Sequence, residues 1–299
     1  MRLCLIQSRF FQPFLLEHQL PNSFIDFAQQ WYLPLADCII DQQNQNKRPL
    51  LLGINGCQGS GKTTLAAFLA YFFQSQGLQV AVLSIDDFYF PQSTRQLLAD
   101  TIHPLLKTRG VPGTHDVALL KHTLDLLLSG QSTIIPRFSK LNDNPLPTNK
   151  WDRIEKPADV VIFEGWFLGA SAQTPAELVN PINRLEKEQD PKAIWRLYAN
   201  RQLANSFSAI FGRVDYWVML KAPGFHAVHQ WRLEQEQKLS IKTNALPHVM
   251  SSEQIADFIA YFQRITEHCL RTLPNKMNDC FYLNEQRDII KVIHKAKKL

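Results

Sequence analysis

The clearest chemical pattern in the chain is a phosphate-binding loop, which follows the spacing G-x-x-x-x-G-K-[ST] in the run Gly56-Cys57-Gln58-Gly59-Ser60-Gly61-Lys62-Thr63. Glycines let backbone N–H groups curl around phosphate oxygens, Lys62 can neutralise the β- and γ-phosphates, and the Thr63 hydroxyl can bind Mg²⁺. An apolar, strand-like run precedes the loop and a helical pattern follows it, which argues against an ordinary Gly-rich turn. We therefore predict that this run, together with Thr64, binds a nucleotide and magnesium.

Two carboxylates follow strand-like runs and are candidates for proton transfer or Mg²⁺ binding. Asp86 comes directly after the apolar segment Val80–Ile85, and Glu164 directly after Asp159–Phe163. In parallel α/β sheets ligands collect at the carboxyl ends of the strands, so both residues are expected near the phosphate loop. Asp86 could accept a proton from an attacking hydroxyl or bind Mg²⁺, with a turn or helix cap as the alternative. Glu164 is expected at Mg²⁺, either directly or through water.

These residues have to be positioned by an α/β fold. Strand-like runs alternate with helical stretches, which predicts a mostly parallel sheet flanked by helices. The expected strands are 50–54, 80–85, 159–163, 214–220 and 280–283, and the expected helices are 62–76, 116–129, 193–211, 226–239 and 251–273. We predict a helical N-terminal appendage at residues 1–48, a P-loop nucleotide-binding domain at 49–299 and, within that domain, a long functional loop at 135–157.

Several polar residues outside the loop and the strand ends are candidates for contacts to the transferred phosphoryl group or to an acceptor. Arg232, on an expected helix, could stabilise charge on the phosphoryl group, with a solvated helix face as the alternative. Arg137 and Lys140 are natural partners for an anionic acceptor, or else surface charges. The remaining acceptor candidates are Asp87, Tyr89, Arg109, His115 and Asp116, of which Asp116 could instead cap a helix.

Composition limits the possible partners. The 299 residues are 45% hydrophobic, enough to bury a large core, and the net charge of +5 is too small and dispersed to favour nucleic-acid binding. The five cysteines are odd in number and well separated, which suits a reducing compartment. Polar residues interrupt the uncharged stretch 63–85, so it is not expected to span a membrane. We expect a cytoplasmic protein with no nucleic-acid or membrane partner.

Taken together, these motifs resemble the P-loop kinases that include uridine kinase, phosphoribulokinase and pantothenate kinase. Within that group the chain is most similar to the D-glycerate 3-kinases, through Asp86-Asp87-Phe88-Tyr89, Arg109–Asp116, Phe163–Trp166 and Trp231–Gln235. The resemblance implies ATP-dependent phosphorylation of glycerate, with Asp86 as base and with Lys62 and Thr63 at phosphate and Mg²⁺.

Two alternatives remain at this stage. One is a kinase of the same fold that acts on a nucleoside, a pantothenate-like acid or a sugar. The other is a nucleotide switch, suggested by the guanine-type signature N-K-x-D at Asn149-Lys150-Trp151-Asp152. That signature precedes the third expected strand instead of ending a late strand, and the chain has no D-x-x-G.

Overall fold

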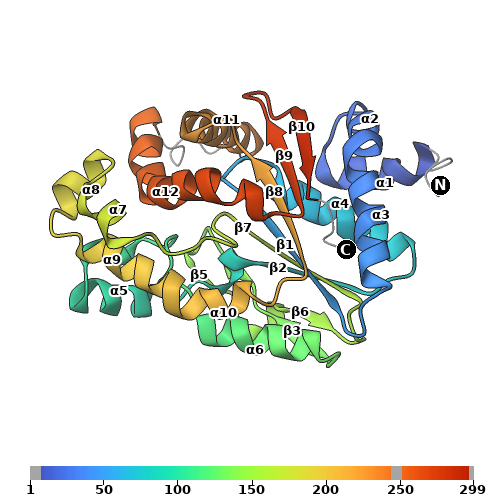
Figure 1. Ribbon diagram of the computed structural model, residues 1–299, viewed down its shortest axis with the longest axis horizontal. Coiled ribbons are helices and arrows are strands. Elements are labelled where there is room, and N and C mark those ends of the chain that lie inside the picture. The colour runs from blue at the N-terminus through green and yellow to red at the C-terminus, as the bar shows by residue number, and fades with distance from the viewer. Residues whose placement is uncertain (1–7, 244–250, 296–299) are drawn as a thin grey trace.

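The chain folds around a six-stranded sheet with the order β10-β9-β8-β1-β7-β2 (Figure 1). The structure is a computed structural model that describes residues 8–243 and 251–295. β1 pairs in parallel with both β7 and β8, and β10 alone runs antiparallel, against β9. The predicted α/β fold with a mostly parallel sheet flanked by helices is therefore confirmed.

The main strands are β1 (Leu50–Gly56), β2 (Val80–Ser84), β7 (Val160–Gly165), β8 (Tyr216–Lys221), β9 (Asp279–Leu283) and β10 (Ile289–His294). The main helices are α1 (Ser8–His18), α3 (Leu33–Gln43), α4 (Lys62–Ser75), α5 (Gln92–Thr101), α6 (Val117–Leu128), α9 (Ile194–Gln202), α10 (Ser208–Phe211), α11 (Phe225–Thr243) and α12 (Ser252–Thr272). The five predicted strands and five predicted helices all occur, with ends shifted by a few residues. The predicted helix at 193–211 is divided by a π-helical turn at Leu203–Phe207.

Both faces of the sheet are covered, which explains why its central strands are apolar along their whole length. Leu50, Leu52 and Ile54 of β1 point into one core with α1, α3, α4 and the start of α11. Leu51 points into a second core on the other face, with α6, α10 and α12. β1 and β7 are buried at every position, as expected for parallel strands with helices on both sides.

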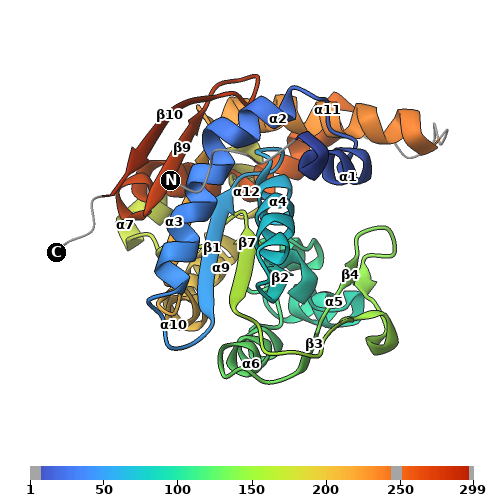
Figure 2. The same ribbon diagram turned by 90° about the vertical axis from the view of Figure 1, so that its right-hand side faces the viewer.

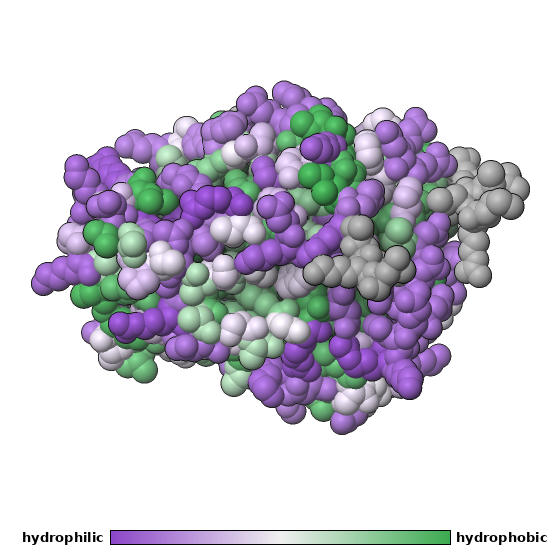
Figure 3. All heavy atoms as spheres, viewed as in Figure 1, coloured by the Kyte–Doolittle hydropathy of each residue, from purple (hydrophilic) through white to green (hydrophobic). Residues whose placement is uncertain are grey.

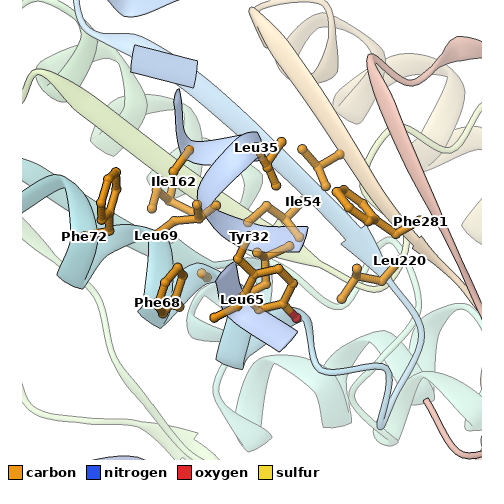
Figure 4. Packing of buried hydrophobic residues seen from close by; sticks show 14 of the residues in the cluster. Tyr32, Leu35, Ile54, Leu65, Phe68, Leu69, Phe72, Ile162, Leu220 and Phe281 are labelled. Atoms are coloured by element: carbon orange, nitrogen blue, oxygen red, sulfur yellow. The ribbon is translucent and has the colours of Figure 1, made fainter. Parts of the chain in front are cut away.

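The N-terminal helices share the first core with α4. Aromatic rings from 10–32 pack on Phe68 and Tyr71 of α4, and Tyr32 packs there with Leu65, Leu69 and Ile162 (Figure 4). The predicted helical character of this segment is thus observed over the part that the structure describes. Its boundary as a separate unit at residue 48 remains a prediction, and residues 1–7 lie outside the described residues.

The segment predicted as a long loop at 135–157 contains short strands. β3 (Thr133–Ile135) pairs with β6 (Asp152–Ile154), and β4 (Phe138–Ser139) pairs with β5 (Asn144–Pro145). This double hairpin lies at the margin of the molecule beside α5 (Figure 2). Strands of two or three residues that include a proline leave no alternating pattern, and this is why the sequence read as a loop.

The surface is mainly polar. On the face shown in Figure 3 the hydrophobic residues form small separate groups among hydrophilic ones. Across residues 8–243 and 251–295, no helix is both long enough and apolar enough to cross a bilayer.

Candidate active site

The phosphate loop connects β1 to α4 in a conformation that only glycine adopts easily. Gly59 and Gly61 have φ angles of +79° and +89°. A Cβ atom on Gly59 would also lie 2.5 Å from Cβ of Trp231, which is wholly buried beneath the loop. Arg287, from the turn between β9 and β10, donates a hydrogen bond from Nε to the Gly59 carbonyl at 2.8 Å. Two distant segments therefore brace the loop.

The loop fits an anionic ligand. The Ser60 hydroxyl is buried and has no hydrogen-bond partner within the described part of the chain. A Cβ on Gly56 would lie 2.5 Å from that hydroxyl, so the space is kept open by glycine. Burial raises the pKa of Cys57 to about 12, against the lowering effect of Lys62. Cys57 therefore stays a neutral thiol, which is unreactive at physiological pH.

Thr63 and Glu164 form a site that fits a magnesium ion. The Thr63 hydroxyl lies 3.4 Å from Oε1 of Glu164, and Lys62 Nζ lies 3.9 Å from Oε2. Oε2 is buried and makes no hydrogen bond to any described residue. Within the described ranges, no group of three or more His, Cys, Asp or Glu side chains is arranged so that it could hold a metal ion by itself. A hard cation here would need phosphate oxygens and water to complete its shell, which is how Mg²⁺ usually binds beside nucleotides.

A cavity of about 210 Å³ opens beside the phosphate loop. It is lined by Gln58, Gly59, Lys62, Thr63, Asp86, Tyr89, Arg109, Lys140, Trp166, Arg232, Phe258 and Phe262. The structure thus brings together residues predicted from five separate segments of the chain. Four of the lining side chains are cationic and one is a carboxylate, so the cavity suits an anionic occupant.

Asp86 lies in a short 3₁₀ helix after β2, with both carboxylate oxygens engaged. Oδ2 accepts a hydrogen bond from Lys140 Nζ at 2.7 Å, and Oδ1 accepts one from the Tyr89 hydroxyl at 2.9 Å. Burial would raise the pKa of Asp86, but Lys140 and Lys62 outweigh it and lower the pKa to about 2. Asp86 is therefore a carboxylate at any physiological pH, which is the form that can accept a proton.

Arg109 and Arg232 complete the charged wall of the cavity. Arg109 is ion-paired with Asp143 of the β4–β5 turn, and its guanidinium lies 5.6 Å from the centre of the Phe138 ring. The guanidinium of Arg232, on α11, lies 5.6 Å from the ring centre of Phe258 on α12. Both arginines are held against aromatic rings at the edge of the cavity, where they can meet an anion.

Four residues predicted to contact an acceptor do not line the cavity, and the structure gives each a supporting role. Arg137 pairs with Asp87 at 2.8 Å and with Asp152 at 2.6 Å, which fastens the hairpin to the end of β2. Asp116 caps α6 by accepting a hydrogen bond from the Leu119 N–H. His115 is 1% exposed, behind Tyr89. The guanine-type signature is likewise part of the hairpin, since its Asp152 binds Arg137.

His115 is buried as a neutral ring. Neither ring nitrogen has a hydrogen-bond partner among the described residues, and the ring packs on Tyr89 and Phe167. Burial lowers the pKa of His115 to about 3. Between the unfolded pKa near 6.5 and pH 3, the unfolded chain takes up a proton that the folded chain does not, so stability falls as pH falls.

We expect His115→Phe to change kcat/KM by less than about threefold, because an apolar ring replaces a group with unpaired polar atoms. The melting temperature of the variant should match that of the original chain at pH 7.5 and exceed it at pH 5, where the buried imidazole opposes folding. Thermal melts at the two pH values and an assay of ADP release test this. A large loss of activity in a stable variant would restore His115 as an acceptor ligand.

Three aromatic residues of the cavity were not anticipated from the sequence. Trp166 follows β7, and Phe258 and Phe262 lie one turn apart on α12. Phe262 also packs against Gly110, where a Cβ would come within 2.7 Å of its ring. This contact explains the glycine after Arg109. Trp166 belongs to the motif Phe163–Trp166, which supported the family resemblance without giving this residue a role. Aromatic residues on an amphipathic helix read as core, so no sequence signal marked Phe258 and Phe262.

The fold and site define a P-loop kinase. A glycine-rich loop with Lys62 and Thr63 faces a carboxylate, Asp86, across a small cationic cavity, while Glu164 ends the neighbouring strand. These are the parts that phosphoryl transfer requires: a phosphate cradle, compensating positive charge and a group that can orient the attacking hydroxyl.

Comparisons with known proteins agree with this class. The Phosphoribulokinase / Uridine kinase family matches residues 51–202, just over half of the chain. An uncharacterized kinase of Schizosaccharomyces pombe, mug58, is 31% identical over 79% of this chain and 87% of its own length. The chain belongs to the phosphoribulokinase/uridine kinase family, and it is an ATP-dependent small-molecule kinase.

Two further similarities concern glycerate kinases. The chloroplastic D-glycerate 3-kinase of Arabidopsis thaliana is 30% identical over 75% of this chain, which spans 48% of the plant protein. The structure of a D-glycerate 3-kinase from Cryptococcus neoformans superposes with a TM-score of 0.73 at 24% identity, covering 88% of this chain and 99% of that one. At this identity the second similarity shows a shared fold.

Proposed function

We propose that the protein transfers the γ-phosphoryl group of ATP to a hydroxyl of a small carboxylic acid, with D-glycerate as the first candidate. The observation that carries the proposal is the cavity itself, which combines Lys62 of the phosphate loop, the carboxylate of Asp86, and the cations Arg109 and Lys140. An acid with a hydroxyl needs both a base for the hydroxyl and cations for its carboxylate. The similarity to a plant D-glycerate 3-kinase supports the same acceptor.

In the proposed reaction the acceptor hydroxyl gives its proton to Asp86 as its oxygen attacks the γ-phosphorus. The bond between that phosphorus and the β–γ bridging oxygen breaks, and its electron pair leaves with ADP. Lys62 and Arg232 stabilise the negative charge on the transferring group. Thr63 and Glu164 would hold Mg²⁺, which when bound neutralises phosphate charge.

The size of the cavity supports a small acceptor. Its volume of about 210 Å³ is bounded by Trp166, Phe258 and Phe262, and it must also admit the end of the triphosphate. A nucleoside or a pantothenate-like acid would require these aromatic walls to move. The larger acceptors used by other kinases of this fold therefore fit this cavity less well than a three-carbon acid does.

A panel of acceptors tests the proposal. With saturating ATP and Mg²⁺, D-glycerate should give ADP release with a kcat/KM at least about 100-fold above that of uridine, pantothenate or fructose, because differences in polar recognition and fit reach this size. Protein carrying Lys62→Ala, purified in parallel, sets the background from contaminating kinases. Faster turnover of uridine or pantothenate than of glycerate would refute the acceptor while leaving the kinase class intact.

A further inference from the structure

Lys140 lies in the exposed turn between β4 and β5, yet its ammonium group reaches the proposed base. The side chain is 65% exposed, and Nζ lies 2.7 Å from Oδ2 of Asp86. A solvated lysine normally stays mobile in water, because holding its long side chain in one geometry has an entropic cost. Here the attraction of Asp86 raises the pKa of Lys140. The lysine is thus held as a cation on Asp86.

With this contact, each oxygen of Asp86 accepts a hydrogen bond from a neighbouring side chain. Oδ2 accepts from Lys140 and Oδ1 from the Tyr89 hydroxyl, so a water molecule entering the cavity competes with a cation and a phenol for Asp86. A carboxylate paired with a cation and a phenol accepts a proton less readily, because both partners stabilise its ionised form. With ATP in the phosphate loop and no acceptor, such a pairing would slow proton transfer from water to Asp86.

The charges around Lys140 indicate what could draw it away. Besides Asp86, the ionised groups that act on its ammonium are Glu164 and Arg109. Arg109 already faces the carboxylate of Asp143. A carboxylate arriving between Lys140 and Arg109 would attract the lysine and expose Oδ2 of Asp86. A neutral acceptor has no charge with which to do this.

We propose that Lys140 masks Asp86 until the carboxylate of the acceptor binds it, so that the anionic group of the acceptor switches the base on. The inference rests on the proposed function and adds a reason why the enzyme would prefer acids to neutral alcohols as acceptors. Acids and neutral alcohols of equal size would differ mainly in kcat, because the neutral alcohol leaves the base covered. The mask would also limit transfer of the phosphoryl group to water before the acceptor binds.

The hairpin does not depend on this lysine for its attachment. Arg137 pairs with Asp87 and Asp152, and Asp143 is held by Arg95 at 2.7 Å and by Arg109. Lys140→Met should therefore keep the hairpin in place while uncovering Asp86. If Lys140 only anchored the hairpin, its removal would lower both acceptor phosphorylation and ATP hydrolysis. If Lys140 masks Asp86, its removal should raise ATP hydrolysis.

The test is ATP hydrolysis without acceptor. In that reaction the oxygen of water bonds to the γ-phosphorus, the bridging P–O bond breaks with its electron pair on ADP, and the proton of water passes through Asp86 to solvent. At saturating ATP, Lys140→Met should hydrolyse ATP about tenfold faster or more than the original chain, part of the effect that a general base can have. Lys121→Met, which removes an exposed lysine paired with Asp125 on α6, is the matched control and should match the original chain.

Two small molecules complete the test. Propionate, a carboxylate without a hydroxyl, should stimulate ATP hydrolysis by the original chain and not by Lys140→Met. The ratio of kcat for glycerate to that for glycerol should be high in the original chain and fall in the variant. Unchanged hydrolysis in both Lys140→Met and Lys140→Gln, with melting temperatures like the original, would overturn the mask. If the original chain did not phosphorylate glycerate, glycerate would be refuted as the acceptor. The mask would still be tested, because the hydrolysis assay contains no acceptor.

Discussion

Replacing Asp86 with asparagine should lower kcat with D-glycerate by roughly 10² to 10⁴-fold, the range expected when a general base is removed. The change keeps the size of the side chain and its hydrogen bond with Tyr89, but an amide cannot take a proton from the attacking hydroxyl. Binding of ATP should change little, because the phosphate loop lies on a different strand end. The measurement is steady-state ADP release together with a nucleotide titration.

Asp125→Asn is the matched control for this prediction. Asp125 is an exposed residue of α6 that pairs with Lys121 and Arg213, outside the cavity. Its replacement should leave kcat within about twofold, as for most surface substitutions. An Asp86→Asn variant that kept most of its kcat would show that the phosphoryl transfer needs no base at this position.

The pH dependence follows from the same residue. Because the neighbouring lysines hold the pKa of Asp86 at about 2, against the effect of burial, the carboxylate remains ionised until the pH falls close to that value. A lowered pKa means that the basic form is lost only on acidification below the usual carboxylate range. A fall in kcat/KM between pH 8 and pH 5 would therefore belong to another group.

The residues that could be predicted from sequence share one property: their neighbours along the chain define their place in space. Lys62 and Thr63 belong to a loop whose backbone path is set by its own glycines, and Asp86 and Glu164 follow strands that end at one edge of a parallel sheet. In such cases local pattern and topology together position a side chain. The core strands were found for the same reason, since their apolar runs are continuous.

The residues that were missed, or given another role, depend on contacts far apart in sequence. Arg287 reaches Gly59 across 228 positions, and nothing in a polar turn distinguishes it from a solvated arginine. Asp87 shares a motif with Asp86 and Tyr89, and His115 shares one with Arg109, yet the side chain of Asp87 turns to Arg137 and that of His115 to the core. Similarly, Glu186 looks like a surface residue of a polar insertion but is buried in an ion pair with Arg264 of α12.

Lys62→Ala should lower kcat/KM for glycerate by roughly 10² to 10³-fold, the loss expected when one preorganised donor to the transferring charge is removed. Lys62 is the cation of the phosphate loop, and Nζ lies 3.9 Å from the buried Oε2 of Glu164. Its removal weakens attraction for the β- and γ-phosphates and leaves that carboxylate without its cation. We therefore expect ATP affinity and kcat to fall together, in contrast to Asp86→Asn, which should lower kcat alone.

This contrast separates the two halves of the site. Lys121→Ala serves as the control for loss of a positive charge elsewhere, and a thermal melt shows whether the Lys62 variant is folded. A folded Lys62→Ala protein with full activity would remove the phosphate-loop mechanism altogether. If both variants lost kcat while only Lys62→Ala lost ATP affinity, nucleotide and acceptor would be handled by separate groups. The site allows this division, because the phosphate loop and the pair formed by Asp86 and Lys140 are separate segments that line the same cavity.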